Sequence, residues 1–102
     1  MGDLVISTQE GNGDVVLSVA GEIDFGNVAE LRTTLARLIK ATTGNVTVDL
    51  AEVTFLDSTA LGVLIQAKRR LLERNDDLVV TNPHPRVARI FEISGLREYL
   101  GA

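Results

Sequence analysis

One stretch, residues 46–68, restricts the possible folds of this chain more than any other. It begins with alternating apolar residues, the period of a β-strand, and from residue 58 onward its apolar residues recur every three or four positions, the period of a helix. The stretch therefore predicts a strand over residues 46–50, an apolar connection over residues 51–56, and a helix whose first residue is Ser58.

Ser58 has two compatible interpretations at that position. Its hydroxyl can cap the helix by accepting a hydrogen bond from a backbone N–H two or three residues on, which contributes about 1 kcal/mol relative to alanine. A helix N-terminus also tolerates a phosphate group, because free N–H donors and the positive end of the dipole face it. Phosphate on Ser58 would stand beside Asp57 and near Asp24, and this concentration of negative charge would repel a partner packed there.

The remaining patterns predict further elements on both sides of this stretch. Two β-rich runs, residues 4–9 and 14–20, flank a glycine-rich turn and predict a hairpin. Apolar residues recur every three or four positions from residue 28 to 38, which predicts a helix capped by Asp24 or Asn27 and ended by Gly44.

After the central helix, whose solvated side is predicted to include Lys68, residues 78–81 predict a short strand, apolar enough to be central. Pro85 suits the first turn of a third helix, which Ser94 and Gly95 end. Residues 96–100 predict a last strand or a turn. This order of elements predicts an α/β fold: a mainly parallel sheet of four to five strands with an N-terminal hairpin and helices packed against it.

Composition and charge exclude several classes of function. The chain has 102 residues, the size of one domain, and it has no cysteine, which excludes disulfides and thiolate metal sites. The net charge of the chain is −4, so the chain does not have the excess of basic residues by which proteins bind nucleic acids. No apolar run reaches the ~20 residues that span a bilayer, and residues 1–3 lack the features of a signal peptide. We expect a cytoplasmic protein that binds neither nucleic acid nor membrane.

The predicted sheet has one edge where a site can form. If the strands after the hairpin turn run parallel, the loops that leave their C-terminal ends meet at the same edge. The residues predicted to become neighbours and to contact a partner there are Asp24, Asp57, Ser58, Thr59 and Asn82.

Catalytic alternatives find less support in the sequence. A hydrolase would use Ser58 as nucleophile, His84 as base and Asp24 or Asp57 to orient the base, but the G-x-S-x-G elbow is missing and His84 stands between two prolines. Gly11 and Gly13 precede a strand and open no helix, so they do not form a dinucleotide site. The chain has no phosphate-binding P-loop, and its histidine, aspartate and glutamate residues do not show the spacing of metal ligands. We therefore predict no catalytic residue, no metal and no cofactor.

Several segments of the chain resemble one known family. The Val-Asp-Leu of residues 48–50 and the Phe-Leu-Asp-Ser-Thr-Ala-Leu-Gly of residues 55–62 resemble the signature of the STAS domain family. The likeness is greatest to the bacterial anti-sigma factor antagonists, in which an Asp-Ser-Ser/Thr-Gly-Leu-Gly run holds a phosphorylated serine. The Gly-Glu-Ile-Asp of residues 21–24 and the segment from Asn82 to Leu96 resemble other parts of the family. Ala60 stands where the family usually has glycine.

The resemblance implies a single STAS domain over residues 1–102 that takes part in partner switching. The unmodified domain would bind an anti-sigma factor that is also a serine kinase, and the sigma factor would be released. The kinase would then phosphorylate Ser58 with its own ATP and magnesium, the domain would dissociate, and a serine phosphatase would reset it. Asp57 and Thr59 would flank the modified serine and Asp24 would face the kinase. An alternative within the same fold is an interaction subunit of a transporter-associated or stress-signalling complex that is not regulated by phosphorylation.

Overall fold

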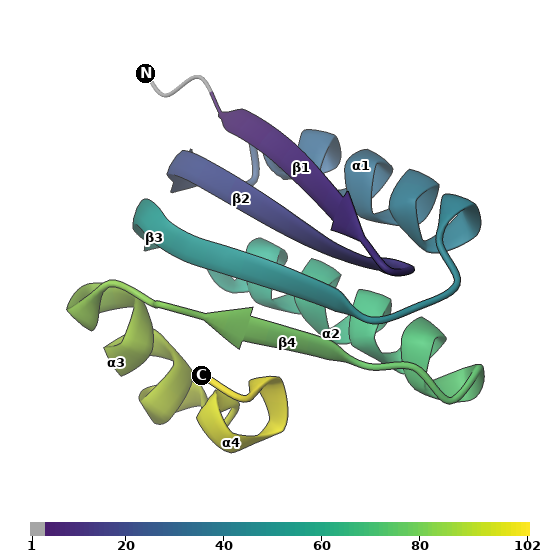
Figure 1. Cartoon of the computed structure of the whole chain (residues 1–102). Helices are drawn as coiled ribbons and strands as arrows, with labels where there is room; N and C mark the ends of the chain where they lie inside the picture. Colours follow the sequence, from purple (N-terminus) through teal and green to yellow (C-terminus); the bar gives the residue numbers. More distant parts are fainter. Residues whose placement is uncertain (1–3) are drawn as a thin grey trace.

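A computed structural model describes residues 4–102, which form one sheet with helices packed against it (Figure 1). The strands are β1 (Val5–Gly11), β2 (Asp14–Ile23), β3 (Val46–Leu56) and β4 (Leu78–Thr81), and the helices are α1 (Val28–Ala41), α2 (Ser58–Glu73), α3 (Pro85–Ser94) and α4 (Arg97–Leu100). The strand order is β1-β2-β3-β4, with β1 antiparallel to β2 and the other two pairings parallel. The predicted α/β fold with an N-terminal hairpin is confirmed.

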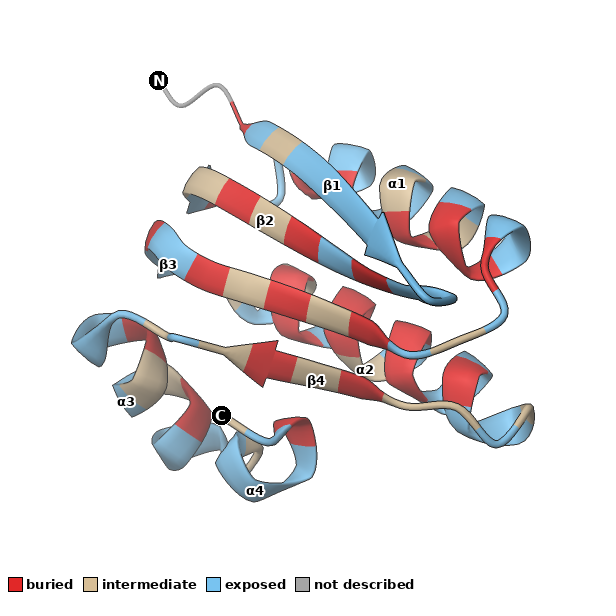
Figure 2. Cartoon of the chain, in the orientation of Figure 1, coloured by how far each residue is buried: buried red, intermediate tan, exposed pale blue. Residues whose placement is uncertain are grey.

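The core lies between the sheet and the pair α1 and α2, which lie behind the sheet in Figure 1. Alternate residues of the central strands are buried and their neighbours are not, as the banding of β2 and β3 in Figure 2 shows. Leu17 and Val48 are among the buried ones, and Val16 is 39% exposed. Helices α3 and α4 pack along the β4 side, where Phe91 and Leu100 are fully buried.

Strands β2 and β3 both extend beyond the predicted boundaries. The prediction that residues 51–56 form a connection is wrong, because β3 continues to Leu56 and pairs with β2 as far as Ile23. The register shifts between Ser18 and Ala20 and again between Gly21 and Glu22, and such irregularities interrupt the alternation by which a strand is recognised in a sequence. Both strands therefore lead directly into the candidate site.

Two predictions for the C-terminal part are also wrong. Strand β4 is an edge strand and not a central one; it is apolar because Leu78 and Val80 face the core while Val79 contacts Gly101 after α4. Residues 96–100 contain the short helix α4 instead of a strand. The left-handed residues Gly95 and Gly101, with φ of 76° and 75°, end α3 and α4 respectively. Pro85 does occupy the first turn of α3, as predicted.

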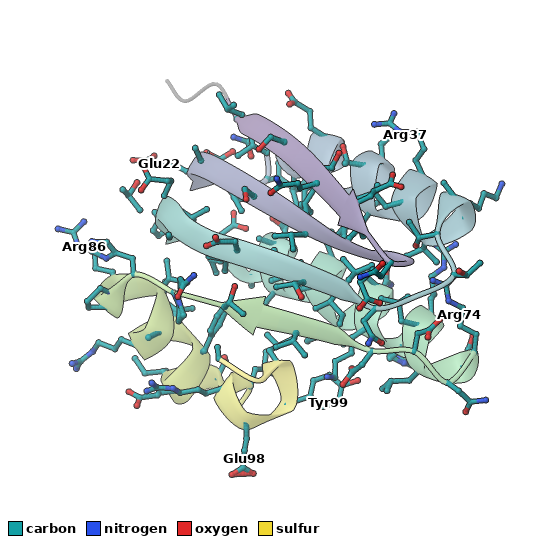
Figure 3. All side chains as sticks on the ribbon, viewed as in Figure 1. Glu22, Arg37, Arg74, Arg86, Glu98 and Tyr99 are labelled. Carbon is teal, nitrogen blue, oxygen red and sulfur yellow. The ribbon has the colours of Figure 1, made fainter. Side chains whose placement is uncertain are left out.

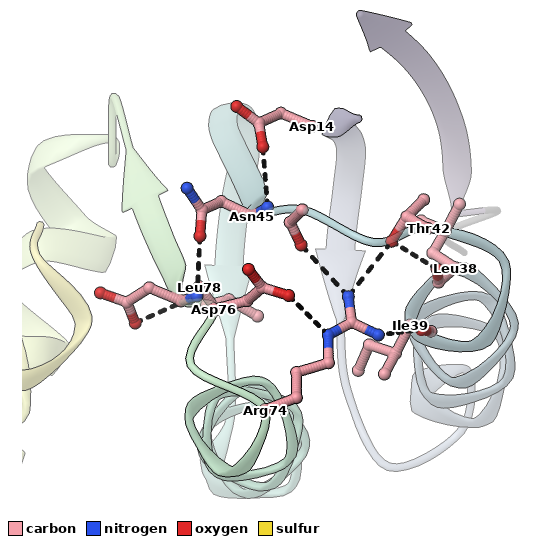
Figure 4. A network of polar contacts seen from close by, with 10 residues as sticks. Asp14, Leu38, Ile39, Thr42, Asn45, Arg74, Asp76 and Leu78 are labelled. Carbon is pink, nitrogen blue, oxygen red and sulfur yellow. Dashed lines mark hydrogen bonds and ion pairs between the residues drawn. The ribbon is translucent and has the colours of Figure 1, made fainter. Parts of the chain in front are cut away.

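The edge where the parallel strands begin is held by polar contacts of Arg74, the residue that follows α2. Arg74 lies at the opposite side of the molecule from Glu22 (Figure 3). Its guanidinium donates to the carbonyl oxygens of Ile39 at 2.5 Å and Gly44 at 3.1 Å, and to Asp76 at 2.8 Å (Figure 4). We call residues 42–45 and 74–77 the Arg74 edge. These contacts join the end of α1, the loop before β3 and the loop before β4.

Two residues near this edge differ from their predicted roles. Helix α1 ends at Ala41, before Gly44; glycine is needed at position 44 because a Cβ there would lie 2.4 Å from the carbonyl oxygen of Gly13. Lys68 is buried and not solvated: its ammonium group donates to Asp77 at 2.8 Å and to the carbonyl of Leu78 at 3.0 Å. A buried ammonium requires such partners. Lys68 thus fastens α2 to the start of β4.

Candidate functional site

The N-terminus of α2 is capped by Asp57, the residue before the helix. One carboxylate oxygen of Asp57 accepts hydrogen bonds from the backbone N–H of Thr59 at 2.9 Å, the N–H of Ala60 at 3.3 Å and the hydroxyl of Thr59. The prediction that Ser58 caps the helix is therefore wrong, although the helix does begin at Ser58. Asp57 has the extended backbone typical of a cap, which leaves the Ser58 side chain free of this structural task.

The second oxygen of Asp57 binds the loop that follows β2. It accepts a hydrogen bond of 3.0 Å from the backbone N–H of Phe25, and the backbone N–H of Asp57 donates to the carbonyl of Ile23. Asp57 therefore fixes the relative position of two segments that are 32 residues apart in the chain. We call residues 22–27 and 55–59 the Ser58 edge.

The loop itself is braced by its own side chains. The Asp24 carboxylate accepts from the N–H of Gly26 and the Asn27 side-chain oxygen accepts from the N–H of Asp24, each at 2.9 Å. Neither side chain caps α1, so that prediction is wrong; both hold the turn between β2 and α1 instead. The turn presents Phe25 to solvent.

The pKa of the Asp57 carboxyl is lowered from its ordinary value of 3.8. Desolvation alone would raise this pKa, but the hydrogen bonds from the Thr59 hydroxyl and from the amides of Ala60, Thr59 and Phe25 together outweigh it. Asp57 is consequently ionised at neutral pH and carries its charge directly beside Ser58.

The exposed side chains of the Ser58 edge combine a hydroxyl, carboxylates and aromatic rings. Ser58 is exposed, Phe25 is 81% exposed and Phe55 is 43% exposed. Residues 4–27 and 42–67 contain no lysine or arginine, so Glu22, Asp24 and Asp57 meet no cation from these segments. Neither phenylalanine was predicted as a site residue. Their positions were the available signal: of the four aromatic residues in the chain, Phe25 directly follows Asp24 and Phe55 lies two residues before Asp57.

Hydrogen bonds hold both Asn82, a predicted contact residue, and His84, the base of the disfavoured hydrolase alternative. The Asn82 amide donates to Asp49 at 3.4 Å, eight residues before Asp57 in the sequence. His84 accepts a hydrogen bond from the N–H of Arg86 at 3.3 Å and so caps α3. The structure thus brings the segments of Asp24, Asp57, Ser58 and Thr59 together and places Asn82 farther along the sheet. Among the described residues no group of histidine and carboxylate side chains is arranged to hold a metal ion.

Replacing Asp57 by alanine is expected to lower the free energy of unfolding at pH 7 by about 1–2 kcal/mol, the cost of losing a helix cap. Because the folded-state pKa is lowered, this contribution is present above the ordinary pKa and disappears as the pH falls through the folded-state value. The difference between the wild type and Asp57→Ala should therefore shrink below about pH 4. Urea unfolding at several pH values measures it, with exposed Glu52→Ala as control; equal losses in both variants would contradict the capping role.

Comparisons with known proteins show which family this chain resembles. The family model described as "STAS domain" matches residues 5–101. The "Anti-sigma-B factor antagonist" of Staphylococcus epidermidis is 32% identical over 84 residues, which cover 82% of this chain and 78% of the relative. The protein of the same name from Staphylococcus aureus strain NCTC 8325 is 31% identical over the same shares of the two chains.

Solved structures share the fold. An anti-sigma factor antagonist from Mycobacterium paratuberculosis superposes with a TM-score of 0.86 at 23% identity, covering 96% of this chain and 83% of its own. The unphosphorylated form of the anti-sigma factor antagonist SpoIIAA gives a TM-score of 0.82 at 23% identity, covering 93% and 84%. No helix within residues 4–102 is long and apolar enough to cross a membrane. The family model, the identity to the relatives and the arrangement of strands all lead to the same conclusion: this chain belongs to the STAS domain family.

Proposed function

We propose that this protein is an anti-sigma factor antagonist whose Ser58 edge binds an anti-sigma factor with serine kinase activity, and that phosphorylation of Ser58 ends the association. The observation that carries the proposal is the exposed Ser58 hydroxyl, which stands at the start of α2 beside an exposed Phe25 that Asp57 holds in place. The relatives named anti-sigma-B factor antagonist support the role. A neighbour of the same fold, the Bacillus cell fate determinant SpoIIAA, has been solved in a phosphorylated form.

The chemistry assigns this chain the part of a substrate and not of an enzyme. Phosphoryl transfer needs an accessible hydroxyl aligned with the phosphate of ATP, and the kinase supplies ATP and magnesium. Ser58 meets the requirement for access, whereas the Thr59 hydroxyl is already hydrogen bonded to Asp57. Ser58 is therefore the better acceptor of the two.

The local hydrogen bonds suggest where the added phosphate would point. Asp57 already occupies the backbone N–H groups of Thr59 and Ala60, two of the donors that a helix N-terminus offers to an anion. Because these two N–H groups are already bound to Asp57, a phosphate on Ser58 would extend toward the partner. It would add a charge of about −1.5 to −2 to the Ser58 edge. The structure of the domain would be kept while its contact surface changed, and a serine phosphatase would reverse the change.

The partner's surface should complement this edge. An exposed aromatic residue surrounded by carboxylates is suited to an apolar pocket with cationic residues at its rim, because aromatic residues supply much of the binding energy at protein interfaces. Phe25 would enter the pocket, and Glu22 and Asp24 would face the cations. Asn82 stays a predicted contact of the same partner, at the far side of its footprint.

The decisive experiment is phosphorylation of the purified protein by candidate kinases of its own organism with ATP and magnesium. We expect one phosphate on each chain, mapped to Ser58 by mass spectrometry, and none in the absence of the kinase. Phosphate on Thr59 alone, or on neither residue, would contradict the proposal. Absence of phosphate from both residues would favour the alternative of an interaction subunit that is not regulated by phosphorylation.

A further inference from the structure

A groove runs between the first strand and the first helix, on the side of the sheet away from β4. It has a volume of about 500 Å³ and is lined by Leu4, Ile6, Ala29, Glu30, Thr33 and Thr34. Leu4 and Ile6 come from the start of the chain and the other four from the first two turns of α1. The floor is apolar and the rim carries hydroxyl groups and one carboxylate.

Strand β1, which forms one wall of this groove, is an unprotected edge of the sheet. Among the described strands it pairs only with β2, so one row of its backbone N–H and C=O groups has no strand beside it. Natural edge strands are usually short or carry lysine, proline or a bulge, which hinder pairing with another chain. β1 has seven residues, and residues 5–9 contain no charge and no proline. Figure 2 shows it exposed along nearly its whole length.

Glu30, the one charged residue among the described residues that line the groove, favours a cation there. Within residues 4–102 the Glu30 carboxylate has no hydrogen bond and no ion pair, although it lies on the groove wall. The described chain before α1 has four carboxylates and no lysine or arginine; the first cation is Arg32, which lines a different groove between α1 and α2. Arg37 is one turn beyond Thr33 and does not line the groove.

We propose that this groove binds an extended, cationic segment of a partner protein. The segment adds to β1 as a fifth strand, its backbone pairs with the free edge, and every second side chain enters the groove, where a lysine or arginine meets Glu30. Backbone pairing gives such a site its affinity and the groove its selectivity. The proposal does not depend on Ser58, because the groove and β1 lie outside the Ser58 edge.

The test is a titration of the ¹⁵N-labelled protein, followed by NMR, with a capped hexapeptide of alternating lysine and valine. We expect chemical-shift changes confined to β1 and the first two turns of α1. The Glu30→Lys variant should bind about tenfold more weakly, since like charges are then opposed across the contact. The exposed Glu73→Lys variant carries the same charge change on α2 and should bind like the wild type.

Two further peptides test the backbone pairing. They have the same sequence but are N-methylated at alternate residues, one at the odd and one at the even positions. Only one edge of an added strand faces β1, so one isomer should bind like the parent peptide and the other should lose binding. Equal binding of both isomers, no shifts at millimolar peptide, or equal losses in Glu30→Lys and Glu73→Lys would overturn the proposal. Protection of β1 amides that grows with protein concentration alone would overturn it too, because a second copy would then occupy the edge.

Discussion

The Ser58→Ala variant is expected to bind the cognate kinase with the affinity of the unmodified protein, and the Ser58→Asp variant at least about tenfold more weakly. Alanine costs the fold nothing at this position because Asp57, and not Ser58, caps α2. Aspartate adds a charge beside Asp57, at a point that the phosphates of the kinase's nucleotide must approach for transfer. Its repulsion from them is only weakly screened at such short range.

A control variant separates a local from a general effect of charge. Thr43→Asp places the same charge on an exposed residue of the Arg74 edge and should leave the affinity unchanged. Binding can be measured by isothermal titration calorimetry with the kinase and ADP. Equal affinities of Ser58→Ala and Ser58→Asp would exclude the charge mechanism. Equal weakening by Ser58→Asp and Thr43→Asp would exclude the proposed binding edge.

The sequence predicted the elements of this fold because local patterns determine them. The apolar period of residues 28–38, the change of period at Ser58 and the proline at position 85 each act within one or two turns of backbone, and each lies where it was expected. The position of Ser58 at the start of α2 followed from the same local signal. Burial of alternate residues then fixed which side of each strand faces the helices.

The features that the sequence could not predict depend on contacts between distant segments. Asp57 and Ser58 are both residue types that cap helices, and the sequence does not show that a second oxygen of Asp57 also binds the Phe25 amide, 32 residues away. The β-bulges that let β3 reach Leu56 exist because β2 lies beside it. The helical pattern alone predicts that Lys68 is solvated, because the pattern does not show that Asp77, which precedes β4, accepts its hydrogen bond. Asn82 lies farther along the sheet from the Ser58 edge because β3 continues seven residues past the last pairing with β4.

Replacing Arg74 by methionine is expected to lower the free energy of unfolding by about 3 kcal/mol, the largest loss we predict for a residue outside the apolar core. The Arg74 side chain is 31% exposed, and its guanidinium group binds three segments at once. Methionine preserves much of the apolar stem but leaves the carbonyl oxygens of Ile39 and Gly44 without this donor, and each buried unsatisfied acceptor costs about 1–3 kcal/mol. The charge also lies close to the C-terminus of α1, where a cation is favourable.

Matched variants determine whether the geometry or the charge of Arg74 matters. Arg74→Lys keeps the charge, but lysine lacks the planar guanidinium group that reaches several acceptors at once. Its loss of unfolding free energy should lie between zero and that of Arg74→Met. Arg70→Met removes an exposed arginine one turn earlier and should change the unfolding free energy by less than about 0.5 kcal/mol. Urea unfolding measures all three variants, and equal losses in Arg74→Met and Arg70→Met would contradict the role of the network. Helix α2 separates the Arg74 edge from the Ser58 edge by about 24 Å, so the phosphorylation of Ser58 should be unchanged in folded Arg74→Met. The residues that stabilise the fold and the residue that is phosphorylated would then lie at opposite ends of one helix.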